Sequence, residues 1–328
     1  MNNIKCCIYT RDFLESPYLN FFIEHYIKLG FDKIFILKTD DYNYDLKYKS
    51  QIEIHKVENL GNIILQKYDY LIKNSGFDWV LSVDIDEILV LHKKYNNNIK
   101  SYIFEKINEN NTINAFYFRW GMIEKYDHEI MNFQNILNVY NVFQNRFVKS
   151  MIKIPLIKSH SEPHTIELNE KLNIYFENII LNKNHSCAHP ITHHSYQESL
   201  LIHLHTRSVN NLIIKSLNTK LLNKNINSSG NFKNFIELID NYNSHKDKSS
   251  ILQDFKTSIG LKARLPFHHT KSPIIQDSIL NNYTIDKYDN PIIDIDTENK
   301  ILKQILKMNN IDYNKYIEFI KNIYFFFE

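Results

Sequence analysis

The chain has 328 residues, 43% of them hydrophobic, which is enough for one large domain or for one domain with an appendage. Its 39 lysines and arginines nearly balance 37 aspartates and glutamates, and a net charge of +2 gives no electrostatic reason to expect a nucleic-acid or membrane partner. The three cysteines, Cys6, Cys7 and Cys187, are too few and too unevenly placed for a disulfide scaffold and favour a reducing compartment.

The chain shows no sign of export or of a membrane anchor. Its N-terminal residues lack an apolar signal region of adequate length. No run approaches the roughly 18 consecutive apolar residues that a membrane helix needs. We therefore expect a cytoplasmic, intracellular protein without a membrane span.

The N-terminal part alternates between strand and helix patterns. Ser16 suits a helix N-cap, Pro17 the first helical position and Gly30 the C-terminal stop. Strands are predicted at residues 4–9, 33–37 and 52–57, and helices at about 17–29 and 62–74. This alternation is typical of a parallel sheet covered by helices.

An acidic stretch follows the next predicted strand, and it is the clearest indication of function in the chain. Residues 80–83 read as a short buried strand that leads into Asp84, Asp86 and Glu87. In an extended backbone, Asp84 and Asp86 point to the same side. A divalent cation, Mg²⁺ or Mn²⁺, would relieve their repulsion and share substrate phosphates, and ligands of open α/β sheets bind at the carboxyl ends of strands. We interpret the stretch as a metal–diphosphate site; the alternative is a solvated acidic turn.

The remaining chain divides into a mixed part and a helical part. A helix is predicted at 99–108 and strands at 115–120 and 145–154, whereas residues 158–207 look irregular and rich in histidine. Helical patterns begin near residue 212 and recur at 232–242, 249–261 and 297–327, with a linker or loop at 272–296.

Several ordered pieces of the chain together resemble the GT-A glycosyltransferases, in particular the family 2-like and family 92-like group. The similarity covers roughly residues 4–215. Two departures are Leu204, where that pattern has an aromatic residue, and the long histidine-rich stretch. The matching pieces are Thr10-Arg11, Tyr18-Leu19, residues 22–26 with 29–33, Trp79 with Asp84-Ile85-Asp86-Glu87, Phe118 with Trp120-Gly121, Arg146 with Lys149-Ser150, and residues 203–208.

The resemblance implies a fold, a reaction and partners. The fold is α/β, a Rossmann-like GT-A domain with a mixed, mainly parallel sheet flanked by helices over residues 1–215. A helical C-terminal extension over 216–328 would pack on that domain or mediate dimerisation. The reaction is transfer of a sugar from a nucleotide diphosphate sugar, by default a UDP-sugar, to a hydroxyl of a glycan, protein or lipid-linked acceptor, with inversion and with Mn²⁺ or Mg²⁺.

The resemblance also suggests roles for individual residues. Asp84, Asp86 and His203 would hold the metal. An inverting enzyme needs a general base, and the candidates are Asp127, Glu162 and Glu124, with Asp127 slightly preferred. Contacts to the nucleotide sugar are expected from Thr10, Arg11, Asp40, Asp41, Asp84, Lys149 and Arg207.

Three other interpretations stay open. A haloacid-dehalogenase-type phosphatase would use Asp84 as its nucleophile, although the motif then lies unusually far from the N-terminus and carries Ile88 where that pattern has threonine or valine. A zinc site could use His185 and His189, but no glutamate completes the motif and Pro190 disfavours a helix there. The third is a GT-A binding module that has lost catalysis.

Overall fold

The protein is described here from a computed structural model. The described part of the chain falls into two compact units. The first holds the described residues of 4–123, 133–204 and 273–293, and the second those of 208–214 and 294–319. The structure describes residues 4–12, 14–38, 47–57, 70–123, 133, 136–139, 141–162, 165–187, 196–204, 208, 210–211, 214, 273–283, 285–308 and 310–319.

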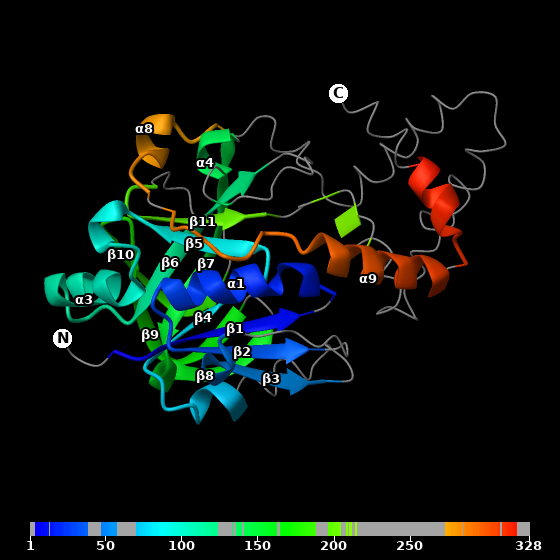
Figure 1. Ribbon diagram of the computed structural model, residues 1–328. Helices are drawn as coiled ribbons and strands as arrows, with labels where there is room; N and C mark the ends of the chain where they lie inside the picture. Colours follow the sequence, from blue (N-terminus) through cyan, green and yellow to red (C-terminus); the bar gives the residue numbers. More distant parts are fainter. Residues whose placement is uncertain are drawn as a thin grey trace. The chain divides into compact units, whose positions relative to one another are not determined.

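Four parallel strands form the part of the sheet that the N-terminal sequence predicts. In sheet order they are β4 (Trp79–Ser82), β1 (Cys6–Asp12), β2 (Lys33–Lys38) and β3 (Ile52–Lys56). The apolar residues of β4, β1 and β2 are buried on both faces, as expected for parallel strands covered by helices, whereas the edge strand β3 leaves Ile54 exposed. Helix α1 (Ser16–Lys28) lies across one face of these strands (Figure 1). All four strand predictions and this helix are therefore confirmed.

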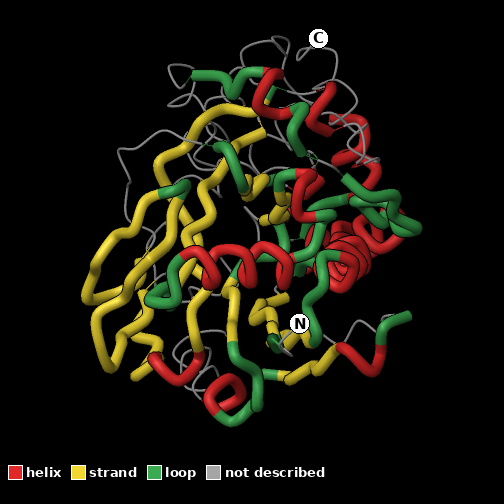
Figure 2. The backbone as a smooth tube through the Cα atoms, turned by 90° about the vertical axis from the view of Figure 1, so that its left-hand side faces the viewer, coloured by secondary structure: helices red, strands yellow, loops and turns green. Residues whose placement is uncertain are grey.

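The other half of the sheet is largely antiparallel. Its strands are β6 (Ala115–Ile123), β7 (Val142–Lys153), β8 (Ile157–Glu162), β9 (Thr165–Phe176) and β10 (Ile179–Cys187). The main sheet order is β10-β9-β6-β7-β4-β1-β2-β3, and the strands form a curved layer in Figure 2. The predicted class, a mixed α/β sheet flanked by helices, is confirmed. The expectation of an irregular region at 158–207 is wrong, because β8, β9 and β10 pair antiparallel there.

Two further strands lie beside the acidic stretch. Strand β5 (Glu87–Leu91) pairs antiparallel with β11 (Ser199–His203), and β11 also pairs in parallel with β6. Gly121 permits this close approach, because a Cβ atom there would lie 2.6 Å from side-chain atoms of both Leu200 and Val142. The pairing sets His203 opposite Glu87 and so brings the C-terminal end of β11 to the acidic stretch.

Shorter elements complete the first unit. Helix α3 (Ile99–Glu109) is capped by Asn98, whose side chain accepts hydrogen bonds from the first-turn amides of Lys100 and Ser101. Two four-residue helices, α4 (Ile136–Val139) and α8 (Asp277–Leu280), and 3₁₀ turns at Lys49–Gln51, Lys93–Tyr95 and Ile154–Leu156 are also present. Residues 289–290 are tied to α1, because the buried Glu24 carboxylate accepts from the backbone amides of Asp289 and Asn290 at 2.8 and 2.9 Å.

The second unit contains helix α9 (Ile295–Met308), which buries Ile301, Leu302, Ile305 and Leu306. No described helix of either unit is long and apolar enough to cross a membrane. Residues 273–293, which the sequence placed inside the extension 216–328, belong to the first unit. Packing or dimerisation through the extension stays a prediction.

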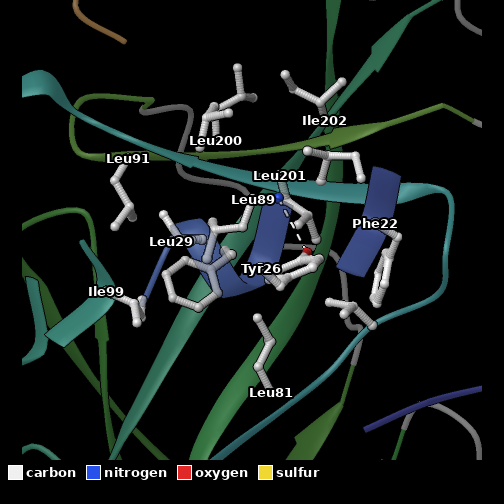
Figure 3. Packing of buried hydrophobic residues seen from close by; sticks show 14 of the residues in the cluster. Phe22, Tyr26, Leu29, Leu81, Leu89, Leu91, Ile99, Leu200, Leu201 and Ile202 are labelled. Atoms are coloured by element: carbon white, nitrogen blue, oxygen red, sulfur yellow. Dashed lines mark hydrogen bonds between the residues drawn. The ribbon is translucent and has the colours of Figure 1, made fainter. Parts of the chain in front are cut away.

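Tyr26 of α1 joins the helix to the strand that follows the acidic stretch. Its hydroxyl donates to the carbonyl oxygen of Glu87 at 2.8 Å and accepts from the amide of Leu89 at 3.2 Å. Figure 3 shows the second bond among the buried side chains around Leu81 and Ile202. One buried side chain thus fixes the start of β5, and with it the backbone of Glu87.

Replacing Tyr26 by phenylalanine is expected to lower the free energy of unfolding by about 1–3 kcal/mol, because two buried backbone groups lose their partner. Urea unfolding measures the change. Tyr70→Phe is the control, because Tyr70 is 73% exposed and its loss of a hydroxyl should change stability by less than about 0.5 kcal/mol. Equal effects of the two variants would show that the Tyr26 hydroxyl does not hold β5.

Candidate active site

The acidic stretch begins where β4 ends and turns back at once into β5. The amide of Glu87 donates to the carbonyl oxygen of Asp84 at 3.0 Å, which closes a turn over residues 84–87. The amide of Asp84 in turn donates to the Glu87 carboxylate at 2.8 Å. The expectation of an extended backbone from Asp84 to Asp86 is therefore wrong, because these residues lie in a turn.

Two basic side chains meet the Asp84 carboxylate from neighbouring strands. Arg11, near the end of β1, places Nε 3.2 Å from Oδ1 of Asp84. Lys149, on β7, places Nζ 3.0 Å from Oδ2 of Asp84 and 3.2 Å from Oε2 of Glu87. Both oxygens of Asp84 therefore already accept from a cation. The side chain of Lys149 is 8% exposed, whereas that of Arg11 is 41% exposed.

The ionisation of this cluster follows from burial and from the two cations. Burial favours the neutral form of Asp84, but Lys149 and then Arg11 outweigh it and hold the pKa of Asp84 well below its usual range. For Glu87 burial prevails over the attraction of Lys149, and its pKa is raised to about 7. Burial also disfavours the Lys149 ammonium, yet Asp84 and Glu87 raise its pKa above the ordinary value. Lys149 is thus a permanent cation at neutral pH.

His203 reaches the cluster from the end of β11. Its Nε2 lies 3.6 Å from Oδ1 of Asp86, which is longer than a hydrogen bond. The amide of Leu204 donates to the carbonyl oxygen of Asp86 at 2.7 Å and ties the end of β11 to the acidic turn. The ring of Trp120 packs against His203 with centroids 4.4 Å apart, and Nζ of Lys149 lies 6.0 Å from the Trp120 ring.

The structure thus brings together most of the predicted site residues that it describes. Thr10 precedes Arg11 on β1 with a buried hydroxyl that has no hydrogen-bond partner within the described part of the chain. Glu162 ends β8, and its side chain lies outside what the structure describes. Five predicted residues fall wholly outside the described residues: Asp40, Asp41, Glu124, Asp127 and Arg207.

Trp120 is a neighbour of the site to which the sequence assigned no role. It belongs to one of the pieces that resemble the GT-A enzymes, but its place beside His203 and Lys149 depends on how β6 pairs with both β7 and β11. A bulge between Arg119 and Gly121 lies at this point of β6. No local sequence pattern predicts this strand pairing or this bulge.

The donor chemistry of the cluster fits a divalent cation that also binds phosphate. Mn²⁺ and Mg²⁺ take carboxylate oxygens, and Mn²⁺ also accepts imidazole. Oε1 of Glu87 is buried and has no hydrogen-bond partner among the described residues, which leaves one carboxylate oxygen of the turn unsatisfied. No group of three histidine, cysteine or acidic side chains within the described ranges is already arranged as a metal site. Any cation would therefore need ligands beyond these side chains or a small rearrangement of them.

Comparisons with known proteins find matches among solved structures. No protein-family model matches the chain, and no curated protein matches it. S. aureus TarS 1–349 in complex with UDP is 12% identical, covers 47% of this chain and 48% of that chain, and has a TM-score of 0.33. The complex of TarS 1–349 with UDP-GlcNAc is 10% identical over 82% of this chain and 74% of that chain, with a TM-score of 0.31.

A putative glucose-1-phosphate thymidylyltransferase from Bacillus anthracis is 14% identical, covers 47% of this chain and 72% of that chain, and has a TM-score of 0.26. The chain thus spans about half of the TarS 1–349 complex with UDP and 29% of a longer TarS chain. Likenesses with TM-scores this low do not assign a function to the chain.

Proposed function

We propose that this chain is a metal-dependent glycosyltransferase that moves a sugar from a nucleotide diphosphate sugar, with a UDP-sugar as the first candidate, to an acceptor hydroxyl. The observation that carries the proposal is a cluster at the carboxyl ends of β1 and β4, made of Arg11, Asp84, Asp86, Glu87, Lys149 and His203. In parallel α/β sheets this is the place where nucleotides bind. Two cations and a carboxylate turn at that place suit a substrate with a diphosphate leaving group.

In this proposal each residue has a defined task. Asp84, Asp86 and His203 would hold Mn²⁺ or Mg²⁺, which supplies charge neutralisation for the departing diphosphate when bound. Arg11 and Lys149 would face the phosphate oxygens, and Thr10 would contact the nucleoside. The base that accepts the acceptor's proton would be Asp127, Glu124 or Glu162. The acceptor class, inversion and a homodimer stay predictions from the family resemblance.

Calorimetric titration of UDP and of GDP, each with Mn²⁺ and with EDTA, tests the proposal on the wild type and on Asp86→Ala. We expect Mn²⁺-dependent binding of one nucleotide and a loss of at least about tenfold in affinity in the variant, the equivalent of one lost charged contact. Asp78→Ala is a matched control, since Asp78 precedes Trp79 at the opposite end of β4 and accepts from the amide of Lys5.

The possible results separate the alternatives. Nucleotide binding without sugar transfer to any acceptor would favour a binding module that has lost catalysis. Release of phosphate from a phosphomonoester, lost in Asp84→Asn, would favour the phosphatase. Absence of UDP and GDP binding to the folded protein would overturn the proposal.

A further inference from the structure

The acidic turn carries its own counter-cations. Asp84, Asp86 and Glu87 supply at most three negative charges, and Lys149 and Arg11 supply two positive charges beside them. The ammonium of Lys149 bridges two of the three carboxylates, and its side chain is almost completely buried. The net charge that a divalent cation would meet here is therefore at most one negative charge, far less than the number of carboxylates suggests.

This arrangement opposes binding of a free divalent cation. A cation at Asp84 would share both carboxylate oxygens with groups that already donate to them, at 3.2 Å and 3.0 Å. It would also lie beside a buried ammonium, where the repulsion between a double and a single positive charge is weakly screened. Lys149 cannot swing into solvent as a surface lysine does, because it is buried on β7.

A bound diphosphate would make binding of the divalent cation favourable. It brings its own oxygen ligands to the cation and enough negative charge to offset the cation, Lys149 and Arg11 together. Arg11 is suited to this exchange, since only its Nε contacts Asp84 and its side chain is 41% exposed. A guanidinium presents several further N–H donors in a planar fork that matches phosphate oxygens.

We propose that Lys149 and Arg11 make this site bind its divalent cation together with a nucleotide diphosphate and not before it. Lys149 holds the carboxylates of Asp84 and Glu87 in place throughout, and the more exposed Arg11 turns from Asp84 to the diphosphate when the diphosphate binds with the cation. The inference rests on the proposed function and adds to it the order in which the ligands enter. Lys149 is a positioning residue in this scheme, because it acts on the cation through the two carboxylates.

Equilibrium dialysis tests the order, because Mn²⁺ and UDP cross the membrane and the protein does not. Protein-bound Mn²⁺ is measured without nucleotide and with saturating UDP. For the wild type we expect the affinity for Mn²⁺ to be at least about tenfold higher with UDP, as the charge balance requires. By reciprocity, Mn²⁺ should raise the affinity for UDP by the same factor.

Substitutions of Arg11 and Lys149 distinguish an effect of their charge on Mn²⁺ binding from a loss of local structure. Arg11→Gln removes a half-buried cation, and it should bind free Mn²⁺ more tightly and UDP with Mn²⁺ more weakly than the wild type. A purely structural role of Arg11 would weaken both. Lys149→Arg keeps the charge and should leave free-Mn²⁺ binding weak. Lys153→Met is the matched control, since Lys153 lies on the same strand opposite Trp79.

The possible results test the order of binding and the proposed function separately. Wild-type protein that binds free Mn²⁺ as tightly as it does with UDP would overturn the inference and leave the proposed function standing. So would an Arg11→Gln variant whose free-Mn²⁺ affinity is unchanged or lower. Protein that binds Mn²⁺ neither alone nor with UDP or GDP would overturn the proposed function and the inference with it.

Discussion

Replacing Lys149 by methionine is expected to lower the free energy of unfolding by about 3–5 kcal/mol, the usual cost of removing one partner from a buried ion pair. The loss arises because the fully buried Glu87 and the partly buried Asp84 would lose the ammonium that bridges them at 3.2 and 3.0 Å. Methionine has a similar length and leaves little cavity, so the change reports mainly on charge. Urea unfolding at pH 7.5 measures it, with Lys153→Met as the control.

A double-mutant cycle separates the ion pair from the packing. Glu87→Gln removes the second carboxylate that Lys149 contacts, while its side-chain amide keeps nearly the same shape. The double variant Lys149→Met, Glu87→Gln should be more stable than the sum of the single changes predicts, because one uncompensated buried charge is removed with its partner. Additive effects would show that the Lys149–Glu87 contact adds nothing to stability.

The elements that the sequence predicted well are those whose signals are local. The strands at β1, β2 and β3 and the helix after Ser16-Pro17 follow from apolar runs, a proline at the start and a glycine at the end. Even here the cap differs from the expectation: Glu15 and not Ser16 is the N-cap residue, and the Asp12 carboxylate accepts from the amide of Glu15 and the hydroxyl of Ser16.

The elements that the sequence did not predict depend on distant partners. Strand β5 reads as an apolar continuation of the acidic stretch, and only its pairing with β11 shows that it is a separate strand after a turn. Lys149 meets Asp84 from 65 positions along the chain. Sequence patterns named Arg11, Lys149 and His203 as candidates by resemblance, but they could not show that two of the three neutralise the acidic turn.

His25 makes the first unit sensitive to acid. Its side chain is fully buried, with Nε2 2.7 Å from the carbonyl oxygen of Leu89 and Nδ1 2.8 Å from the hydroxyl of Tyr288. The carbonyl can only accept, so Nε2 carries the proton and Nδ1 accepts from Tyr288. Burial outweighs the hydrogen bond to Leu89 and the attraction of Asp286, and it lowers the pKa of His25 from 6.5 to about 4.

The sign of the effect follows from linkage. Between pH 6.5 and 4 the unfolded chain binds a proton at this histidine and the folded protein does not, so stability falls as the pH falls. The contribution is complete above pH 6.5, loses about 2 kcal/mol by pH 5 and about 3 kcal/mol by pH 4. Most of this loss of stability is therefore expected between pH 6.5 and 4, above the usual pKa of carboxylates.

Urea unfolding of the wild type and of His25→Gln at pH 7.5, 6.5, 5.5 and 5.0 isolates this term, because every other titrating group is common to both proteins. The stability advantage of the wild type over the variant should shrink by about 2 kcal/mol between pH 7.5 and 5.0. Proton–carbon NMR of the ring should at the same time show a neutral His25 in the folded protein at pH 5.5. A constant difference between the two proteins, or a ring that protonates near pH 6.5, would mean that water reaches this side chain in the folded state.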